Sequence, residues 1–245
     1  MADIVLIHGA FHGGWCWRDG AERLRAQGHR VFAPSLTGLG DRAHLLTKEV
    51  NLDTHIADVC GVIEAEELND VVLVAHSYGG MPVTGAADRL AGRIGALVYL
   101  DAFTPSDGES ALAIRSAAGG TAALSISLPE GKIAMDVPPA HLFGVDGTMK
   151  DWVQRRMTPH PFATFEQPIS LSGAWLSVPR KIYVRKNQYP APYFDQYIER
   201  WSKDADWVAF NLEAAHNLMM TDPEWFVGLI NEHALPGPAA RIANR

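Results

Sequence analysis

The sequence is short of cysteine, with only Cys16 and Cys60 among its 245 residues. Two thiols cannot form the disulfide framework that stabilises small secreted proteins, and they suit a reducing cytoplasm. An apolar run at residues 4–7 begins almost at once, without the basic segment and long apolar stretch of a signal peptide. We therefore expect a cytoplasmic protein.

Long apolar runs and basic tracts are missing as well. No apolar window approaches the roughly 18–20 residues of a membrane-spanning helix, so no membrane attachment is expected. The net charge of −7, from 21 basic and 28 acidic residues, argues against a nucleic-acid partner. No His, Asp and Glu grouping has the short spacing of a zinc site, and we expect neither metal nor cofactor. Instead, His8, His12 and His76 are expected to bond loop carbonyls.

The sequence is rich in apolar residues, at 47%, against 20% charged residues, which is enough for a sizeable core. Short apolar runs are expected to form six strands, at residues 4–7, 29–33, 71–75, 94–100, 181–184 and 207–212. Helical spacing is found at residues 15–27, 52–68, 78–90, 192–201 and 223–233. This alternation predicts an α/β fold with a mostly parallel six-stranded sheet and helices on both faces.

The alternation stops between residues 104 and 178. This stretch contains many small, Pro and Gly residues with scattered large apolar ones, and it is too long for a plain loop. It is interpreted as a mostly helical cap inserted into a core domain made of residues 1–103 and 179–245. We expect the cap to lie over the C-terminal ends of the strands, where ligands bind in open α/β sheets.

Residues 71–80 carry the most specific local pattern. An apolar run leads to Ser77, with the small residues Ala75 and Gly79 two positions away on either side. This spacing is typical of a nucleophile elbow, in which a serine is held on a strained turn from strand to helix. The alternative is a tight turn with a capping serine. The pattern predicts Ser77 as a nucleophile above the sheet, at the N-terminus of the following helix.

Two further segments would meet Ser77 at the same edge of the sheet. His216 follows the last strand, and the chain order Ser…Asp…His fits a general base, although a surface histidine is the alternative. The loop after the first strand has to offer a backbone N–H to the oxyanion, beside the N–H of the residue after the nucleophile. We assign these two donors to Ala10 and Tyr78.

Three segments carry a family pattern: residues 7–15 (IHGAFHGGW), 75–81 (AHSYGGM) and 215–219 (AHNLM). With them the chain resembles the α/β-hydrolases, and among these the plant-type methylesterase and hydroxynitrile-lyase branch with its bacterial relatives. The resemblance extends from residue 4 to residue 230 and is weakest in the insertion. It implies Ser77 as nucleophile, His216 as base and an oxyanion hole at Ala10 and Tyr78.

The acid that completes a Ser-His-acid triad is not at the position where the plant branch has it. There the acid follows the strand after the insertion, but here residues 184–190 read VRKNQYP, without a carboxylate. Asn187 could orient a histidine but carries no charge. Another position known in α/β-hydrolases is the end of the preceding strand, which Asp101 occupies. We predict Asp101 as the acid, against Asn187, no acid, or an aspartate that only caps the turn.

These residues predict a serine hydrolase that cleaves small hydrophobic or aromatic carboxylic esters through an acyl-enzyme. Phe11, Phe103 and Trp152 are expected to line the substrate pocket, with simple packing as their alternative. Other functions left open are a hydroxynitrile lyase, a C–C bond or lactone hydrolase, and a non-catalytic binding protein. The lyase branch has threonine in place of Gly9 and lysine in place of Asn217, which disfavours lyase activity. A homodimer is left open.

Overall fold

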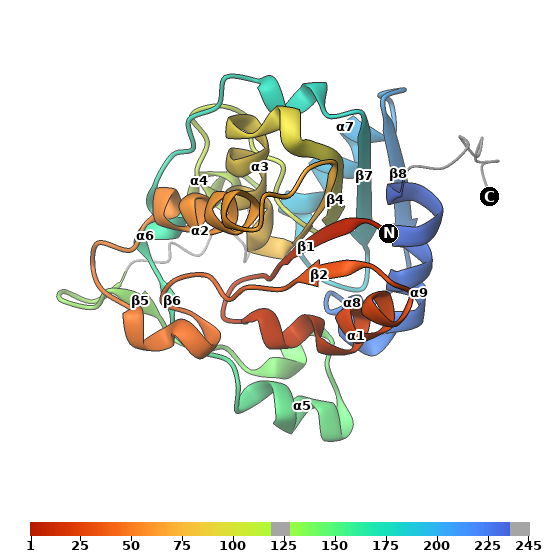
Figure 1. Cartoon of the computed structure of the whole chain (residues 1–245). Coiled ribbons are helices and arrows are strands. Elements are labelled where there is room, and N and C mark those ends of the chain that lie inside the picture. The colour runs from red at the N-terminus through yellow and green to blue at the C-terminus, as the bar shows by residue number, and fades with distance from the viewer. Residues whose placement is uncertain (119–127, 236–245) are drawn as a thin grey trace.

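The computed structural model describes residues 1–118 and 128–235, and its centre is a six-stranded sheet in the order β2-β1-β3-β4-β7-β8 (Figure 1). All five neighbouring pairs are parallel. The strands are β1 (Asp3–Ile7), β2 (Arg30–Phe32), β3 (Val71–His76), β4 (Ile94–Leu100), β7 (Arg180–Lys186) and β8 (Trp207–Leu212). The predicted fold class is confirmed.

Helices cover both faces of this sheet (Figure 1). On one face lie α2 (Leu52–Ala65), α3 (Gly80–Arg89) and α7 (Asp195–Trp201). On the other lie α1 (Arg18–Ala26) and α9 (Pro223–Leu229), with α8 (Leu218–Thr221) before α9. Single turns are η1 (Gly14–Trp17), η2 (Gly40–Leu45), η3 (Ser77–Gly79), η4 (Ala91–Arg93), η6 (Ala140–Phe143), η7 (Ala174–Ser177), η8 (Pro192–Phe194) and η9 (Ile230–Ala234).

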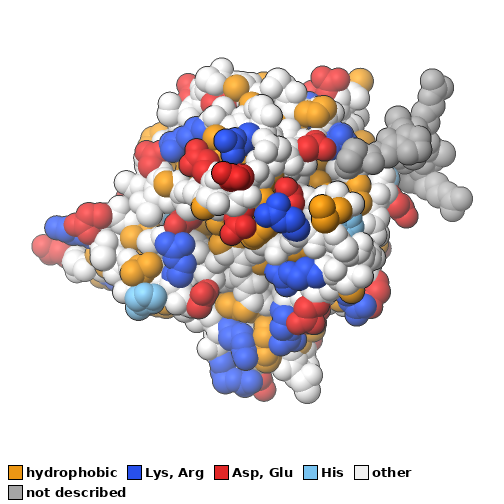
Figure 2. Space-filling view, viewed as in Figure 1, with side chains coloured by type: hydrophobic (Ala, Val, Ile, Leu, Met, Phe, Trp, Pro, Cys, Tyr) orange, Lys and Arg blue, Asp and Glu red, His pale blue; other side chains and the backbone are white. Residues whose placement is uncertain are grey.

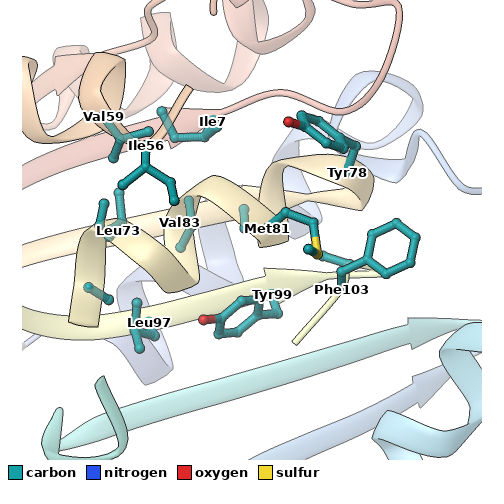
Figure 3. Packing of buried hydrophobic residues seen from close by; sticks show 14 of the residues in the cluster. Ile7, Ile56, Val59, Leu73, Tyr78, Met81, Val83, Leu97, Tyr99 and Phe103 are labelled. Carbon is teal, nitrogen blue, oxygen red and sulfur yellow. The ribbon is translucent and has the colours of Figure 1, made fainter. Parts of the chain in front are cut away.

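The central strand β3 is apolar at successive positions because both of its faces are buried. Leu73 and Ala75 point into the core under α2 and α3, whereas Val72 and Val74 point into the opposite core. Such runs are typical of parallel strands covered by helices on both sides. Figure 3 shows the first core, in which Ile7 of β1 and Leu97 of β4 lie on either side of the β3 and α3 residues.

Helix α2 begins with a capping box. The side chain of Asn51 accepts the N–H of Thr54 at 3.1 Å, and the hydroxyl of Thr54 accepts the N–H of Asn51 at 3.3 Å. This exchange satisfies two N–H groups that have no partner within the helix.

Residues 104–178 contain short helices and a small ladder. The helices are α4 (Ala111–Ala117), α5 (Gly147–Gln154) and α6 (Ala163–Glu166). Strands β5 (Ala134–Met135) and β6 (His160–Pro161) pair in antiparallel fashion. The sequence predicted a mostly helical insertion, whereas the described residues form short helices joined by irregular segments, together with a ladder that was not expected. In Figure 1, α5 and the two short strands lie along one side of the molecule, away from α3 and α7.

Charged side chains are distributed over the surface. Figure 2 shows acidic and basic groups intermixed over most of the face in view. Among residues 1–118 and 128–235, none of the helices combines the length and apolar character needed to span a bilayer. Within the same ranges, no cluster of three or more His, Cys, Asp or Glu side chains could hold a metal ion.

Candidate active site

Ser77 lies on the turn between β3 and α3, with φ at 54° in the left-handed region. Non-glycine residues rarely adopt this conformation, and where they do, the surroundings must hold them in it. Two backbone approaches provide this constraint. A Cβ atom on Gly79 would lie 2.7 Å from the carbonyl oxygen of His8, and one on Gly80 would lie 2.0 Å from that of Phe103. The glycines are therefore required by the close packing of the elbow.

The loop after β1 lies directly against Ser77. A Cβ atom on Gly9 would lie 2.8 Å from the Cβ of Ser77 and 2.9 Å from Nδ1 of His76. Ala10 is the next residue of this loop, and Tyr78 is the residue after the serine. These are the two positions from which the N–H groups of an oxyanion hole were expected.

His216 and Asp101 form a buried hydrogen-bonded pair. Nδ1 of His216 donates to Oδ2 of Asp101 at 2.6 Å, and both side chains are almost inaccessible to solvent. Because Nδ1 holds the proton, Nε2 of the neutral ring is left as an acceptor. Nε2 is buried and has no hydrogen-bond partner among the described residues, so the Ser77 hydroxyl does not bond it here. In free enzymes such contacts often close only when substrate binds.

Asp101 is held by donors from the neighbouring strand. It follows β4 with φ at 49°, and its Oδ1 accepts from Nη1 of Arg185 at 2.9 Å and from the N–H of Lys186 at 3.1 Å. Burial acts to raise the pKa of Asp101, but the hydrogen bond from His216 and the charges of His216, Arg185 and Lys186 outweigh it and lower that pKa. The alternative residue, Asn187, has an exposed side chain.

The guanidinium group of Arg185 donates hydrogen bonds from all three of its nitrogen atoms at the C-terminal edge of the sheet. Besides Asp101, it donates from Nε to Asp195 at 2.7 Å and from Nη2 to the carbonyls of Tyr189 and Ala191, both at 3.2 Å. The ring of Tyr189 stacks on the ring of His216 with centroids 3.9 Å apart. One buried side chain thus fixes the carboxylate and the loop that packs against the histidine.

The backbone of His216 is fixed by two further donors. Nζ of the fully buried Lys186 and Nε2 of His76 both donate to the carbonyl of His216 at 3.0 Å. Burial lowers the pKa of Lys186 to about 8, against the charge of Asp101. Burial also lowers the pKa of His216 below its ordinary value, and the hydrogen bond and charge of Asp101 only partly oppose it. At neutral pH the imidazole is therefore an unprotonated acceptor.

Residues 4–229 match the model of the alpha/beta hydrolase family. The chain belongs to this family. It is 43% identical over 233 residues to a carbendazim hydrolyzing esterase from Nocardioides sp. (strain SG-4G), a match that covers 91% of this chain and 96% of that protein. Methylesterase 9 of Arabidopsis thaliana is 37% identical over 106 residues, or 43% of this chain and 41% of the plant protein.

Solved structures agree on the fold. An extracellular α/β-hydrolase from a Paenibacillus species superposes with a TM-score of 0.77 at 21% identity, covering 95% of this chain and 99% of the other. The resemblance to the methylesterase branch is confirmed, and the chain is an enzyme, an esterase-type α/β-hydrolase.

Two buried histidines of this α/β-hydrolase hold loops around the site. His8 bonds the carbonyl of the next residue at 2.8 Å and accepts the N–H of Leu36 at 3.0 Å. His12 bonds the carbonyl of Ala10 at 2.7 Å and accepts from the amide of Asn217 at 3.1 Å. Burial lowers the pKa of His8 to about 3 and that of His12 to about 4, so each is a neutral ring with one donor and one acceptor. His12 joins the loop of Ala10 to the loop of His216.

A cavity of about 470 Å³ is lined by two rings that stack on His216, although neither His216 nor Ser77 is among its lining residues. We call it the cavity beside His216. Phe11, Phe143 and Tyr189 are in its wall, and the last two rings stack on His216. Residues from the insertion complete much of the remaining wall, among them Arg115 and Met135. Of the three residues expected to line a substrate pocket, Phe11 therefore lines the cavity beside the candidate base.

Phe103 and Trp152 do not line this cavity. Phe103 is buried, and its ring stacks on that of Tyr193 with centroids 5.6 Å apart. Its N–H donates to the carbonyl of Ser77 at 3.1 Å, so it stabilises the backbone of the elbow. Trp152 lines a separate cavity of about 340 Å³ with Trp15. A sequence does not say on which side of a fold an aromatic residue of an insertion lies.

Sequence reasoning missed two histidines near the elbow. Nδ1 of His160 accepts the N–H of Phe11 at 3.3 Å, and its ring lies 4.6 Å from that of Tyr78. The Tyr78 hydroxyl bonds Nδ1 of His55 at 2.9 Å. They come from β6 and α2, and no local spacing connects them. Arg185 was also missed, although two cations in a segment where the resemblance implies an acid are a signal that could have been used.

Proposed function

We propose that this α/β-hydrolase cleaves carboxylic esters with Ser77 as nucleophile, His216 as general base and Asp101 as the orienting acid. The observation that carries the proposal is the buried hydrogen bond from His216 to Asp101, because it leaves Nε2 unprotonated and unpartnered. A histidine held in this tautomer by a carboxylate is the central element of serine hydrolase triads. The strained conformation of Ser77 and the glycines around it support the assignment.

The reaction would proceed in two halves. His216 takes the proton of the Ser77 hydroxyl as its oxygen attacks the ester carbonyl, and the N–H groups of Ala10 and Tyr78 stabilise the oxyanion. His216 then gives that proton to the leaving alcohol, and an acyl-enzyme remains. Water is activated by the same imidazole and releases the acid. Asp101 stabilises the imidazolium in both halves.

The substrate is an ester with a small hydrophobic or aromatic acyl group. The walls of the cavity beside His216 support this, because Phe11, Phe143 and Tyr189 present aromatic surface. Relatives support it too: one hydrolyses carbendazim, others are methylesterases, and a pyrethroid hydrolase from Sphingobium wenxiniae is 34% identical over 111 residues. We propose a small leaving alcohol such as methanol. Residues 104–178 would act as a cap that sets acyl specificity.

Gly9 argues against cyanohydrin cleavage on this scaffold. The lyase branch has threonine here, and in this chain any Cβ would collide with Ser77 and His76. The elbow thus has no room for the lyase residue. The same crowding suits an esterase, since it keeps the loop of Ala10 close to the serine.

A panel of methyl esters of aromatic acids, p-nitrophenyl esters and carbendazim tests the proposal. We expect ester hydrolysis, loss of turnover by several orders of magnitude in Ser77→Ala, and covalent labelling of Ser77 by a fluorophosphonate. Ser177→Ala, at an exposed serine in η7, is the matched control and keeps both properties. Absence of labelling at Ser77, or cyanide release from mandelonitrile without ester hydrolysis, would contradict it.

A further inference from the structure

Arg115 of α4 projects into the cavity beside His216. Its guanidinium carbon lies 5.5 Å from the ring centre of Tyr193 and 5.9 Å from that of Phe165. Its Nε atom is buried and has no hydrogen-bond partner among the described residues. The group is thus partly removed from water, and aromatic faces replace part of its hydration.

No carboxylate in the described part of the chain forms an ion pair with this charge. Within residues 1–118 and 128–235, Arg115 takes part in no ion pair. The acid that lines the same cavity, Asp136, is paired with Lys132. Residues 119–127, GGTAALSIS, contain no acidic side chain. An unpaired, partly desolvated cation in a ligand cavity is costly unless a ligand supplies the anion.

The two rings under Arg115 connect it to the elbow. Phe165 stacks on Tyr78 with centroids 5.0 Å apart, and Tyr193 stacks on Phe103 at 5.6 Å. Tyr78 follows Ser77 in the chain, and Phe103 is hydrogen-bonded to Ser77 through the backbone. The guanidinium thus lies one aromatic layer beyond the residues that flank the nucleophile. The cavity has a candidate base near one wall and an unpaired cation at another.

We propose that Arg115 selects substrates whose acyl part ends in a carboxylate, so that the preferred esters are half-esters of aromatic dicarboxylic acids. The inference rests on the proposed ester hydrolysis and specifies its substrate class. A guanidinium suits this role because its planar N–H groups match both oxygens of a carboxylate. The aromatic wall of Phe11, Phe143 and Tyr189 would hold the ring between the two ends.

Two nearly isosteric esters test the selection. Monomethyl terephthalate carries a distal carboxylate, and methyl 4-methylbenzoate carries a methyl group in its place. We expect Arg115→Met to lower kcat/KM for the charged ester about 10- to 100-fold, the loss typical of a charged hydrogen bond, mostly through KM. The neutral ester should change less than about threefold, and Arg115→Lys should recover part of the preference.

Arg156→Met is the matched control. Arg156 also lies over an aromatic ring, that of Trp152 at 4.1 Å, but it does not line the cavity beside His216. Its loss should leave the ratio of the two kcat/KM values unchanged. Equal losses for both esters in Arg115→Met would show that Arg115 only packs against Phe165 and Tyr193, and would overturn the proposal, as would no loss for either ester.

A binding measurement separates this inference from the proposed function. Calorimetry in the Ser77→Ala background, which prevents turnover, compares the binding of monomethyl terephthalate and methyl 4-methylbenzoate with and without Arg115→Met. If the wild-type protein hydrolyses neither ester, the proposed hydrolysis fails, yet tighter binding of the charged ester that Arg115→Met abolishes would still support the anion site. If Ser77-dependent hydrolysis is found but both esters bind alike, the anion site fails and the hydrolase stands.

Discussion

The C-terminal ends (tips) of two neighbouring strands, β4 and β7, carry side chains of opposite charge, and both contact His216. The tip of β4 carries Asp101, and the tip of β7 carries Arg185 and Lys186. Their parallel pairing, with Leu100 opposite Val184, brings these residues together. In the branch that the chain resembles, the acid follows the later strand. Here the carboxylate lies at the end of the earlier strand, β4, and the cations lie at the end of the later strand, β7.

In the proposed mechanism the histidine requires a carboxylate at a point in space, whichever strand carries it. Either tip can reach Nδ1 of His216, because both end at the same edge of the sheet. A carboxylate at the end of β4 also requires a partner for its charge. A buried carboxylate needs compensation, and Arg185 supplies it while it holds the loop of Tyr189 against the histidine ring. The cations at β7 are therefore part of the proposed acid site.

The largest effect is expected from Asp101→Asn. The amide keeps the size of the side chain but removes the charge that stabilises the imidazolium, so kcat should fall roughly 10⁴-fold. Steady-state kinetics on a p-nitrophenyl ester measures it, with circular dichroism to check the fold. Adding Asn187→Asp should not restore the rate, because the side chain at residue 187 is exposed. If the double variant recovered a kcat near that of the wild type, the acid would have to be assigned to the end of β7.

The same two tips show how much the sequence can predict. The strand β4, the elbow at Ser77 and the position of Asp101 follow from apolar runs, small residues and chain order, which are local signals. The hydrogen bonds of Arg185 could not be predicted, because its partners Asp101, Asp195 and Tyr189 come from separate segments. The cavity that Trp152 lines could not be predicted for a related reason: irregular segments such as residues 104–178 have no period that assigns a side chain to a face.

Arg185→Met should give the next largest effect, on stability. Removing one partner of a buried ion pair costs about 3–5 kcal/mol of unfolding free energy, and Arg185 is 4% exposed against 0% for Asp101. Urea denaturation measures this loss. If the variant unfolds at the same urea midpoint as the wild type, the cation at β7 does not stabilise the relocated acid.

The pH dependence of that loss has a defined sign. The folded pKa of Asp101 is lowered, so the stability that its charge contributes is present above the unfolded pKa, about 3.9, and is lost as pH falls through the folded value. The cost of Arg185→Met should therefore be largest near pH 7 and shrink as pH falls below about 4 towards the lowered pKa of Asp101, where the folded carboxyl also becomes protonated. A cost independent of pH would assign the effect to the carbonyls of Tyr189 and Ala191.

A smaller effect is expected in the pH profile of kcat/KM. Activity requires neutral His216 and is lost as pH falls through its pKa, which burial lowers below the ordinary value of 6.5. The wild type should therefore keep more than half of its plateau activity at pH 6.5. Lys186 and Arg185 contribute to this lowering, so Lys186→Met should move the acid limb to higher pH. A limb that moves to lower pH would contradict the assigned role of the cations.

The smallest effect is expected at the opposite end of β7. Arg180 pairs with Asp70 at 3.3 Å, but the two side chains are 27% and 61% exposed. Exposed pairs contribute about 0–1 kcal/mol because water screens them, so Arg180→Gln should shift the urea midpoint little and leave kcat unchanged. This variant removes the same charge from the same strand as Arg185→Met. Similar losses from both variants would mean that charge on β7, and not the burial of Asp101, decides the stability of this edge.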